Sequence, residues 1–117
     1  MKYQKGRDVS FTGPLPSAIE KLIAAVNAQD TEGFVGAFTP DAVIDDWGHQ
    51  VVGHDEIRAW NEGEFTGPDV RIDVTRVERA GQTIVLTVLT SRGTSRSSSH
   101  WAFDIDDDIV TRTTIRA

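Results

Sequence analysis

The sequence predicts an α+β fold, because helical patterns occupy the first half of the chain and strand patterns the second half. Apolar residues at positions 19, 22, 23 and 26 follow the spacing of one helix face. After Gly67-Pro68 the pattern changes to alternation of apolar and polar residues, with long β-branched segments joined by short turns. Long strands with short connections predict a strongly curved antiparallel sheet, with the helices packed on one of its faces.

Two helices are predicted before the first strand. Ser17-Ala18-Ile19-Glu20 matches a capping box, with Ser17 as N-cap, and predicts a helix over residues 17–29. Asp30 is placed to cap a second, short helix over residues 31–38. The segment Thr39-Pro40-Asp41 is expected to end that helix.

The remaining elements are one helix and six strands. Residues 41–46 predict a first strand, and residues 50–52 are expected to pair with it. A third helix is predicted at 54–64, where an acidic start suits the helix dipole. The later strands are predicted at residues 69–79, 82–92, 97–106 and 109–117.

The length of 117 residues fits one domain, which at this size can bury roughly two thirds of its unfolded surface. Residues 14–117 are predicted to form this domain. Residues 1–13 are polar and without a period, so we expect an N-terminal arm, loosely held or bound by a neighbouring subunit. Tyr3 and Phe11 of this arm could then pack across an interface.

Composition excludes several functional classes. The chain has no cysteine, which removes disulfides and thiolate metal sites, and its three histidines show no metal-binding spacing. The net charge of −6, with scattered basic residues, argues against nucleic acid and against an anionic membrane surface. No apolar segment reaches the roughly 18 residues of a membrane span, and no signal-peptide core follows the N-terminus. We therefore expect a cytoplasmic protein without a metal or cofactor.

The segment DAVIDDWG, residues 41–48, carries two carboxylates directly into apolar surroundings. A strand end reaching solvent would explain it, and so would a carboxylate at the mouth of a pocket. Strand alternation places Asp46 on one face with Ala42 and Ile44, and Asp45 on the other face with Val43. Both faces mix apolar and acidic residues, so alternation alone does not select between the two acids.

The order of these elements resembles the nuclear transport factor 2-like superfamily, which includes ketosteroid isomerases, limonene-epoxide hydrolases and SnoaL-like polyketide cyclases. The segment AAVNAQD (24–30) and the F-x-x-D-A-x-x-x-D pattern from Phe38 to Asp46 are typical of that group. The segment WGHQVVGHDEIRAW (47–60) and the last strand resemble small SnoaL-like proteins. The resemblance covers residues 16–117 and implies a cystatin-like cone, in which the curved sheet wraps the helices and leaves an apolar cavity open at one end. Fold alone does not determine function here.

The resemblance implies that Asp46 takes the position of the isomerases' general base, while Asp45 matches an outward neighbour. Burial in a cavity would raise the pKa of such a carboxyl group toward useful base strength. The remaining isomerase residues are absent, because Leu22 occupies the tyrosine position and Ser99 the position of the protonated acid. Losing one such donor typically costs about 10² to 10³ in rate, so steroid isomerisation is not expected.

Arg112 is a second candidate. By its match to the family, the last strand turns Val110, Arg112 and Thr114 inward, and a buried arginine needs a partner, for which Asp46 is the obvious choice. This pair resembles part of the Asp-Arg-Asp trio of limonene-epoxide hydrolases, whose second carboxylate has no counterpart here. The alternative is that Arg112 lies at the rim or on the outer face.

The resemblance implies a cavity that binds a small apolar or weakly acidic molecule. The residues expected to line this cavity are Leu22, Val26, Phe38, Ile44, Trp47, Trp60, Ser99, Trp101 and Phe103. For Trp60, packing of the third helix against the sheet competes with ligand contact, and Trp47 could be a lid or a dimer contact.

Three functions are compatible with these residues. The first is a SnoaL-like enzyme (isomerase, cyclase or hydrolase) acting on an apolar substrate, with Asp46 as base or orienter of water and Arg112 as its partner. The second is a binding protein that uses the same cavity without chemistry. The third is a dimerisation module, and in every case we expect a homodimer formed by the outer sheet face around Val77.

Overall fold

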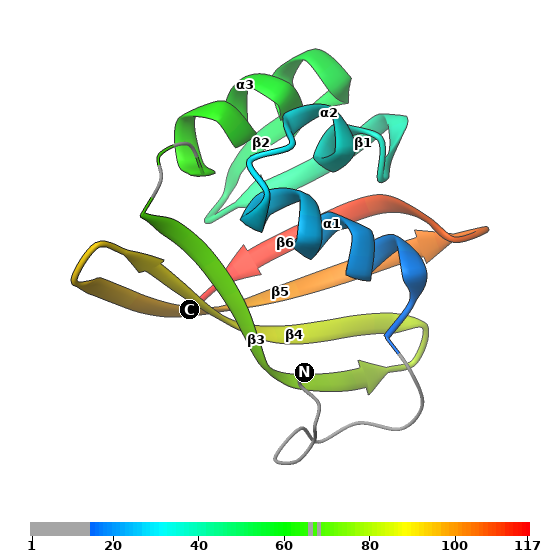
Figure 1. The fold of residues 1–117 in the computed structure, drawn as a ribbon. Helices are drawn as coiled ribbons and strands as arrows, with labels where there is room; N and C mark the ends of the chain where they lie inside the picture. Colours follow the sequence, from blue (N-terminus) through cyan, green and yellow to red (C-terminus); the bar gives the residue numbers. More distant parts are fainter. Residues whose placement is uncertain (1–14, 66, 68) are drawn as a thin grey trace.

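The computed structural model describes residues 15–65, 67 and 69–117, so the predicted N-terminal arm lies outside the described residues. The chain has three helices and one six-stranded sheet, which confirms the α+β fold class. Figure 1 shows the helices on one face of the curved sheet. The elements are α1 (Ser17–Asn27), α2 (Thr31–Val35), β1 (Phe38–Asp46), β2 (His49–Val52), α3 (Gly53–Phe65), β3 (Val70–Ala80), β4 (Thr83–Arg92), β5 (Ser95–Asp106) and β6 (Ile109–Arg116). No described helix has the length and apolar character needed to span a membrane.

The strand order is β2-β1-β6-β5-β4-β3. The pairs β1–β2, β3–β4, β4–β5 and β5–β6 are antiparallel, including the predicted pairing of residues 50–52 with the first strand. The pairing of β1 with β6 is parallel, which differs from the all-antiparallel sheet that was predicted. One helix and four strands separate β1 from β6 in the chain, so no short turn constrains their relative direction.

A bulge in β3 changes which residues face the helices. Val74 pairs with Val88 and Arg76 pairs with Thr87, so Thr75 is an extra residue in the ladder. Val77 therefore faces the helices and is 3 % exposed. The expectation that Val77 lies on the outer face was wrong, because simple alternation does not account for the extra residue.

The predicted capping box of α1 does not form. Pro16 occupies the N-cap position and Ser17 is the first helical residue. The Ser17 hydroxyl donates instead to Asp108 in the β5–β6 turn, and the same carboxylate accepts the Ala18 N–H at 3.3 Å. The Asp108 side chain, which is distant in the sequence, thus accepts a free backbone N–H at the start of the helix.

Local residue choices explain where the first two helices end and begin. Gln29 has a positive φ of 58°, and the N–H of Asp30 bonds back to the carbonyl of Ala25, as in a Schellman termination. Asp30 then caps α2 as predicted, accepting the Gly33 N–H at 3.0 Å. Helix α2 is shorter than predicted, because Phe38 already pairs with β6 as the first residue of β1.

The core lies between the helices and the inner face of the sheet. Its largest fully buried side chains include Phe34, Phe38, Phe103, Ile19 and Leu22. Asn27 links α1 to the edge strand β3, because its amide donates to the Ile72 carbonyl and accepts the Ile72 N–H. The helices consequently cover one sheet face only, and the other face remains free of them (Figure 1).

Candidate functional site

A pocket of about 180 Å³ lies where the end of β1, helix α3 and strands β4 to β6 meet. The β1 end contributes a carboxylate and the following turn an exposed indole, whereas α3 and the sheet contribute aromatic and hydroxyl groups. The lining residues are Asp46, Trp47, Trp60, Glu64, Phe65, Thr90, Arg92, Ser97, Ser98, Ser99, Trp101 and Ile115. The pocket therefore combines carboxylates, hydroxyls and flat aromatic walls.

Asp46 lies in the pocket wall, on the same strand face as buried Ala42 and Ile44. Its Oδ2 accepts a hydrogen bond from the Trp60 indole N–H at 3.0 Å. No described residue bonds to its other oxygen, Oδ1. Trp60 thus holds the carboxylate in one orientation and leaves an acceptor available to a bound molecule.

Asp45 faces the outer side of the sheet and has a different environment. Its carboxylate accepts the Gly48 N–H at 2.8 Å and lies 3.1 Å from Arg116 and 3.4 Å from Arg112. The Arg116 hydrogen bond, followed by the Gly48 N–H, holds the pKa of Asp45 below its usual value of 3.8. Asp45 is thus an ionised group that ties β1, its turn and β6 together.

Arg112 does not contact Asp46, and the expected pair was wrong. On β5 the neighbours Asp104 and Ile105 pair with Arg112 and Val110, which leaves Thr111 as an extra residue in β6. Val110 faces the core, but after this bulge Arg112 lies on the outer face beside Asp45. The bulge reverses the alternation from which an inward Arg112 was expected.

Five residues that were expected to line the cavity instead fill the interior. They are at most 1 % exposed and none of them lines the pocket: Leu22, Val26, Phe38, Ile44 and Phe103. Trp47, Trp60, Ser99 and Trp101 do line it together. The aromatic contacts between Trp60, Phe65 and Trp101, with ring centroids 5.4 and 5.9 Å apart, close the space beneath.

Ser99 is positioned to donate a hydrogen bond. Its Oγ accepts the Trp101 indole N–H at 3.0 Å, and its hydroxyl proton remains free to donate. At the rim, Arg92 lies 3.7 Å from Glu64 and neutralises that carboxylate. The pocket therefore offers Asp46 as an acceptor and the Ser99 hydroxyl as a donor.

The sequence reasoning missed two buried polar residues. Asn61 is 5 % exposed and Thr113 is 1 % exposed, and within the described chain neither Asn61 Nδ2 nor Thr113 Oγ1 has a hydrogen-bond partner. Asn61 follows Trp60 directly, and Thr113 lies two residues before Ile115. The available signal was the spacing of Ile57, Asn61 and Phe65, four residues apart, which places a polar side chain in the apolar stripe of α3.

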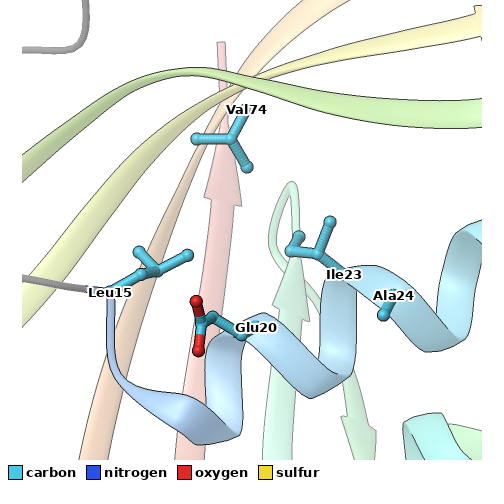
Figure 2. Close-up of a pocket in the computed structure, with 5 residues that line it drawn as sticks. All are labelled: Leu15, Glu20, Ile23, Ala24 and Val74. Carbon is cyan, nitrogen blue, oxygen red and sulfur yellow. The ribbon is translucent and has the colours of Figure 1, made fainter. Parts of the chain in front are cut away.

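A second hollow lies between α1 and β3 (Figure 2). We call it the α1–β3 groove and define it by Leu15, Glu20, Ile23, Ala24 and Val74. Among these five described residues the side chains are mainly apolar, and Glu20 is the one titratable group. In the part of the chain that the structure describes, no group of three His, Cys, Asp or Glu side chains could hold a metal ion. The Asp46 pocket is therefore the candidate for chemistry.

Comparison with known proteins identifies one family. A family model described as a SnoaL-like domain matches residues 19–116. Among curated proteins, no sequence matches the chain.

Solved structures share the fold at low identity. A protein from Sinorhizobium meliloti that is proposed to be a polyketide cyclase is 22% identical, with a TM-score of 0.78 over 87% of this chain and 95% of that one. An uncharacterised cystatin-fold protein from Novosphingobium aromaticivorans is 20% identical, with a TM-score of 0.77 over 86% and 96%. A protein from Kribbella flavida that is proposed to be a ketosteroid isomerase is 20% identical, with a TM-score of 0.74 over 86% and 74%.

Proposed function

The chain belongs to the family of SnoaL-like domains, and from that premise we propose that it is a small-molecule enzyme of isomerase or cyclase type in which Asp46 acts as general base. The observation that carries this proposal is the orientation of Asp46 in the pocket. Trp60 occupies Oδ2 at 3.0 Å and leaves Oδ1 for the substrate. A fixed carboxylate within hydrogen-bond reach of a substrate proton is the geometry that general base catalysis needs.

The proposed reaction is proton abstraction next to a carbonyl group. Asp46 takes the proton from carbon, and the negative charge that develops on the carbonyl oxygen accepts a hydrogen bond from Ser99. Return of the proton to another carbon completes an isomerisation. In a cyclisation the carbanion attacks a second carbonyl within the molecule, and the alkoxide that forms takes the proton back from Asp46. Both outcomes use the same two residues.

The site also limits the substrate. Ser99 is a single neutral donor and therefore stabilises an enolate only modestly, which favours a carbon acid that is already activated, such as a 1,3-dicarbonyl compound or an acyl lactone. The pocket of about 180 Å³ is smaller than the roughly 300 to 1,000 Å³ that is typical for drug-sized ligands. A compact ring held between Trp47, Trp60 and Trp101 fits these limits better than a steroid.

A non-catalytic binding protein is the second candidate. It is favoured by the filled interior and by the position of Arg112 on the outer face, since both reduce the number of groups able to stabilise a transition state. In that case Asp46 and Ser99 would bind complementary donor and acceptor groups of a ligand without proton transfer.

Exchange of carbon-bound hydrogen with deuterated water tests the proposal. Compounds that raise the thermal midpoint in a screen of small 1,3-dicarbonyls and lactones are incubated with the protein, and deuterium incorporation is followed by NMR. Asp46→Asn should lower exchange by about 10² or more, because the base is removed. The matched control Glu64→Gln, the other carboxylate of the pocket, should exchange at nearly the wild-type rate.

Two outcomes separate the candidates. If the wild-type protein bound a compound without exchanging its hydrogen, the result would support a non-catalytic binding protein. No exchange rate could then be measured as a function of pH. If the Asp46→Asn variant exchanged hydrogen at the wild-type rate, another group would have to be the base.

A further inference from the structure

The Asp46 pocket has a cation at its rim, Arg92, to which the proposed reaction gives no role. Among the described residues that line the pocket, Arg92 is the one cation. Its ion-pair partner in the described chain is Glu64, 3.7 Å from Nη2, and it makes no hydrogen bond to a described residue. An ion pair at this distance between half-exposed side chains contributes little to stability, so the guanidinium is available to a ligand.

The pocket wall next to Arg92 carries hydroxyl groups. Thr90 lies two residues before Arg92 on the same face of β4, and it pairs with Ser97 of β5. Both residues line the pocket, and neither hydroxyl bonds to a described residue. Farther along β5 come Ser99 and then the buried Trp101, so the wall becomes more polar toward Arg92.

We propose that Arg92 binds a carboxylate group of the substrate and that the pocket therefore selects compact organic acids. This inference rests on the proposed function only in taking the Asp46 pocket as the substrate site. A guanidinium beside two free hydroxyls supplies hydrogen bonds to both oxygens of a carboxylate, and the bonds from the guanidinium are charge-assisted. The substrate class is an oxo acid, with its acidic carbon at Asp46 and its carbonyl oxygen at Ser99.

A ligand carboxylate can bind Arg92 while Glu64 stays in place. Glu64 lies near one nitrogen of the guanidinium, and the other nitrogens have no described partner. Elsewhere in the protein Arg58 holds two carboxylates at once, with Nε 2.7 Å from Glu32 and Nη1 3.0 Å from Asp55. Because a guanidinium has five N–H donors, Arg92 can bind Glu64 and a ligand in the same way.

The charges of the pocket determine the direction in which an anion binds. A ligand carboxylate next to Asp46 would meet a like charge, because the described partner of Asp46 is the neutral indole of Trp60. At Arg92 the charge of the ligand is compensated, so the opposite end of the molecule is directed to Asp46. A cationic ligand would leave the guanidinium and the adjacent hydroxyls without an acceptor.

Binding of a matched acid and amide tests the inference. The probes are 3-oxocyclohexanecarboxylic acid and its carboxamide, which share a ring ketone and have nearly the same size but differ in charge at neutral pH. Each probe is titrated into the protein, and the dissociation constant is measured from NMR chemical shifts. The wild type should bind the acid at least about ten-fold more tightly than the amide, and added salt should reduce this preference.

Arginine variants locate the charge preference in the pocket. Arg92→Gln should remove the preference for the acid, whereas Arg92→Lys keeps the positive charge and should retain part of it. The matched control is Arg96→Gln, which removes the same charge from an exposed position of β5 outside the described pocket lining. This control should keep the full preference for the acid.

Several results would overturn the inference. They are the absence of detectable binding of the acid, equal affinities of the wild type for acid and amide, and a preference that persists in Arg92→Gln or is lost in Arg96→Gln. The proposed function fails separately, because these are binding measurements. A preference that requires Arg92 without any hydrogen exchange would contradict catalysis alone, and exchange that requires Asp46 without a charge preference would contradict the role of Arg92 alone.

Discussion

Asp45 and Asp46 are adjacent in the chain but lie on opposite faces of β1. Asp46 has one neutral partner, the Trp60 indole, and lies in the pocket wall. Asp45 has two arginines and a backbone N–H as partners. Because charge-assisted bonds to several donors stabilise an ionised carboxylate, Asp45 suits a structural role and Asp46 remains available to a ligand.

Asp45→Asn should reduce the stability of the fold at neutral pH without changing ligand binding in the pocket. The pKa of Asp45 is lowered in the folded state, so its contribution is fully present above its usual value of 3.8 and is lost as the pH falls through the lower folded value. The difference in unfolding free energy between wild type and variant should be constant above about pH 5 and decrease in more acidic solution. Urea titrations between pH 2.5 and 7 measure it, and a difference that grows on acidification would contradict the assignment.

Trp47→Asn should stabilise the fold and weaken binding in the pocket. Trp47 and Gly48 both have positive φ, 54° and 92°, in the β1–β2 hairpin, where Asn-Gly is the preferred pair. A left-handed conformation costs a residue such as tryptophan roughly 1 to 2 kcal/mol, and the indole is 60 % exposed and so loses few contacts. Urea denaturation should show a gain of about 1 kcal/mol, and a less stable variant would mean that the indole contacts outweigh the backbone cost.

Among the elements, α1 depends on a distant turn. The β5–β6 turn contains Asp107 and Asp108, which both have positive φ, but only Asp108 bonds to the start of α1. This contact replaces the local cap that the sequence suggested. It also holds the pKa of Asp108 below its usual value, through the Ser17 hydroxyl first and the Ala18 N–H second.

Asp108→Ala should loosen the first turn of α1, whereas Asp107→Ala should not. Both substitutions place alanine in a left-handed position of the same turn, so they share the backbone cost and differ only in the contact with α1. Hydrogen exchange should show faster exchange of the amides of residues 18–20 in Asp108→Ala and a thermal midpoint a few degrees below that of Asp107→Ala. Equal behaviour of the two variants would show that the contact contributes nothing to the helix start.

At the scale of the whole molecule, the helices cover one sheet face only (Figure 1). The outer face presents half-buried or exposed apolar side chains from four strands: Val43, Val52, Val85, Leu89 and Ala102. Val52 is 47 % exposed. Apolar side chains gathered on a sheet face favour self-association.

We expect a homodimer that buries this outer face. Val85→Arg should dissociate it, because a charge would be placed in the apolar centre of the interface, whereas Val85→Thr should retain it. Light scattering at tens of micromolar measures the mass. A monomeric wild type at these concentrations would rule out the dimer.

Much of the fold was predictable from local patterns. The apolar stripe at residues 19–26 and the β-branched segments after residue 68 predicted α1 and the four last strands, since the period of burial follows directly from helix and strand geometry. Alternation predicted that Asp46 shares a face with Ala42 and Ile44, and the resemblance to the superfamily selected Asp46 over Asp45 as the carboxylate of the pocket, where it lies. Its role there remains a proposal.

The alternation of strand residues failed at two places for one physical reason. Thr75 and Thr111 are each an extra residue in the pairing of their strand, so the residues that follow point to the opposite face from the one that simple alternation gives. Val77 and Arg112 were therefore predicted on the wrong faces of the sheet. A bulge depends on the strand that is paired alongside, and the local sequence carries no signal for it.

The sequence by itself determined the fold class, the order of the elements, the cap of α2 and the face on which Asp46 lies. Each depends on residues close in the chain, whose preferences act over one or two turns of helix or a few strand positions. Only the tertiary structure decided which acid binds arginine, which apolar residues fill the interior instead of lining a pocket, and which side chain caps α1. These outcomes depend on contacts between residues as far apart as Ser17 and Asp108, which become neighbours only when the sheet and the helices have packed together.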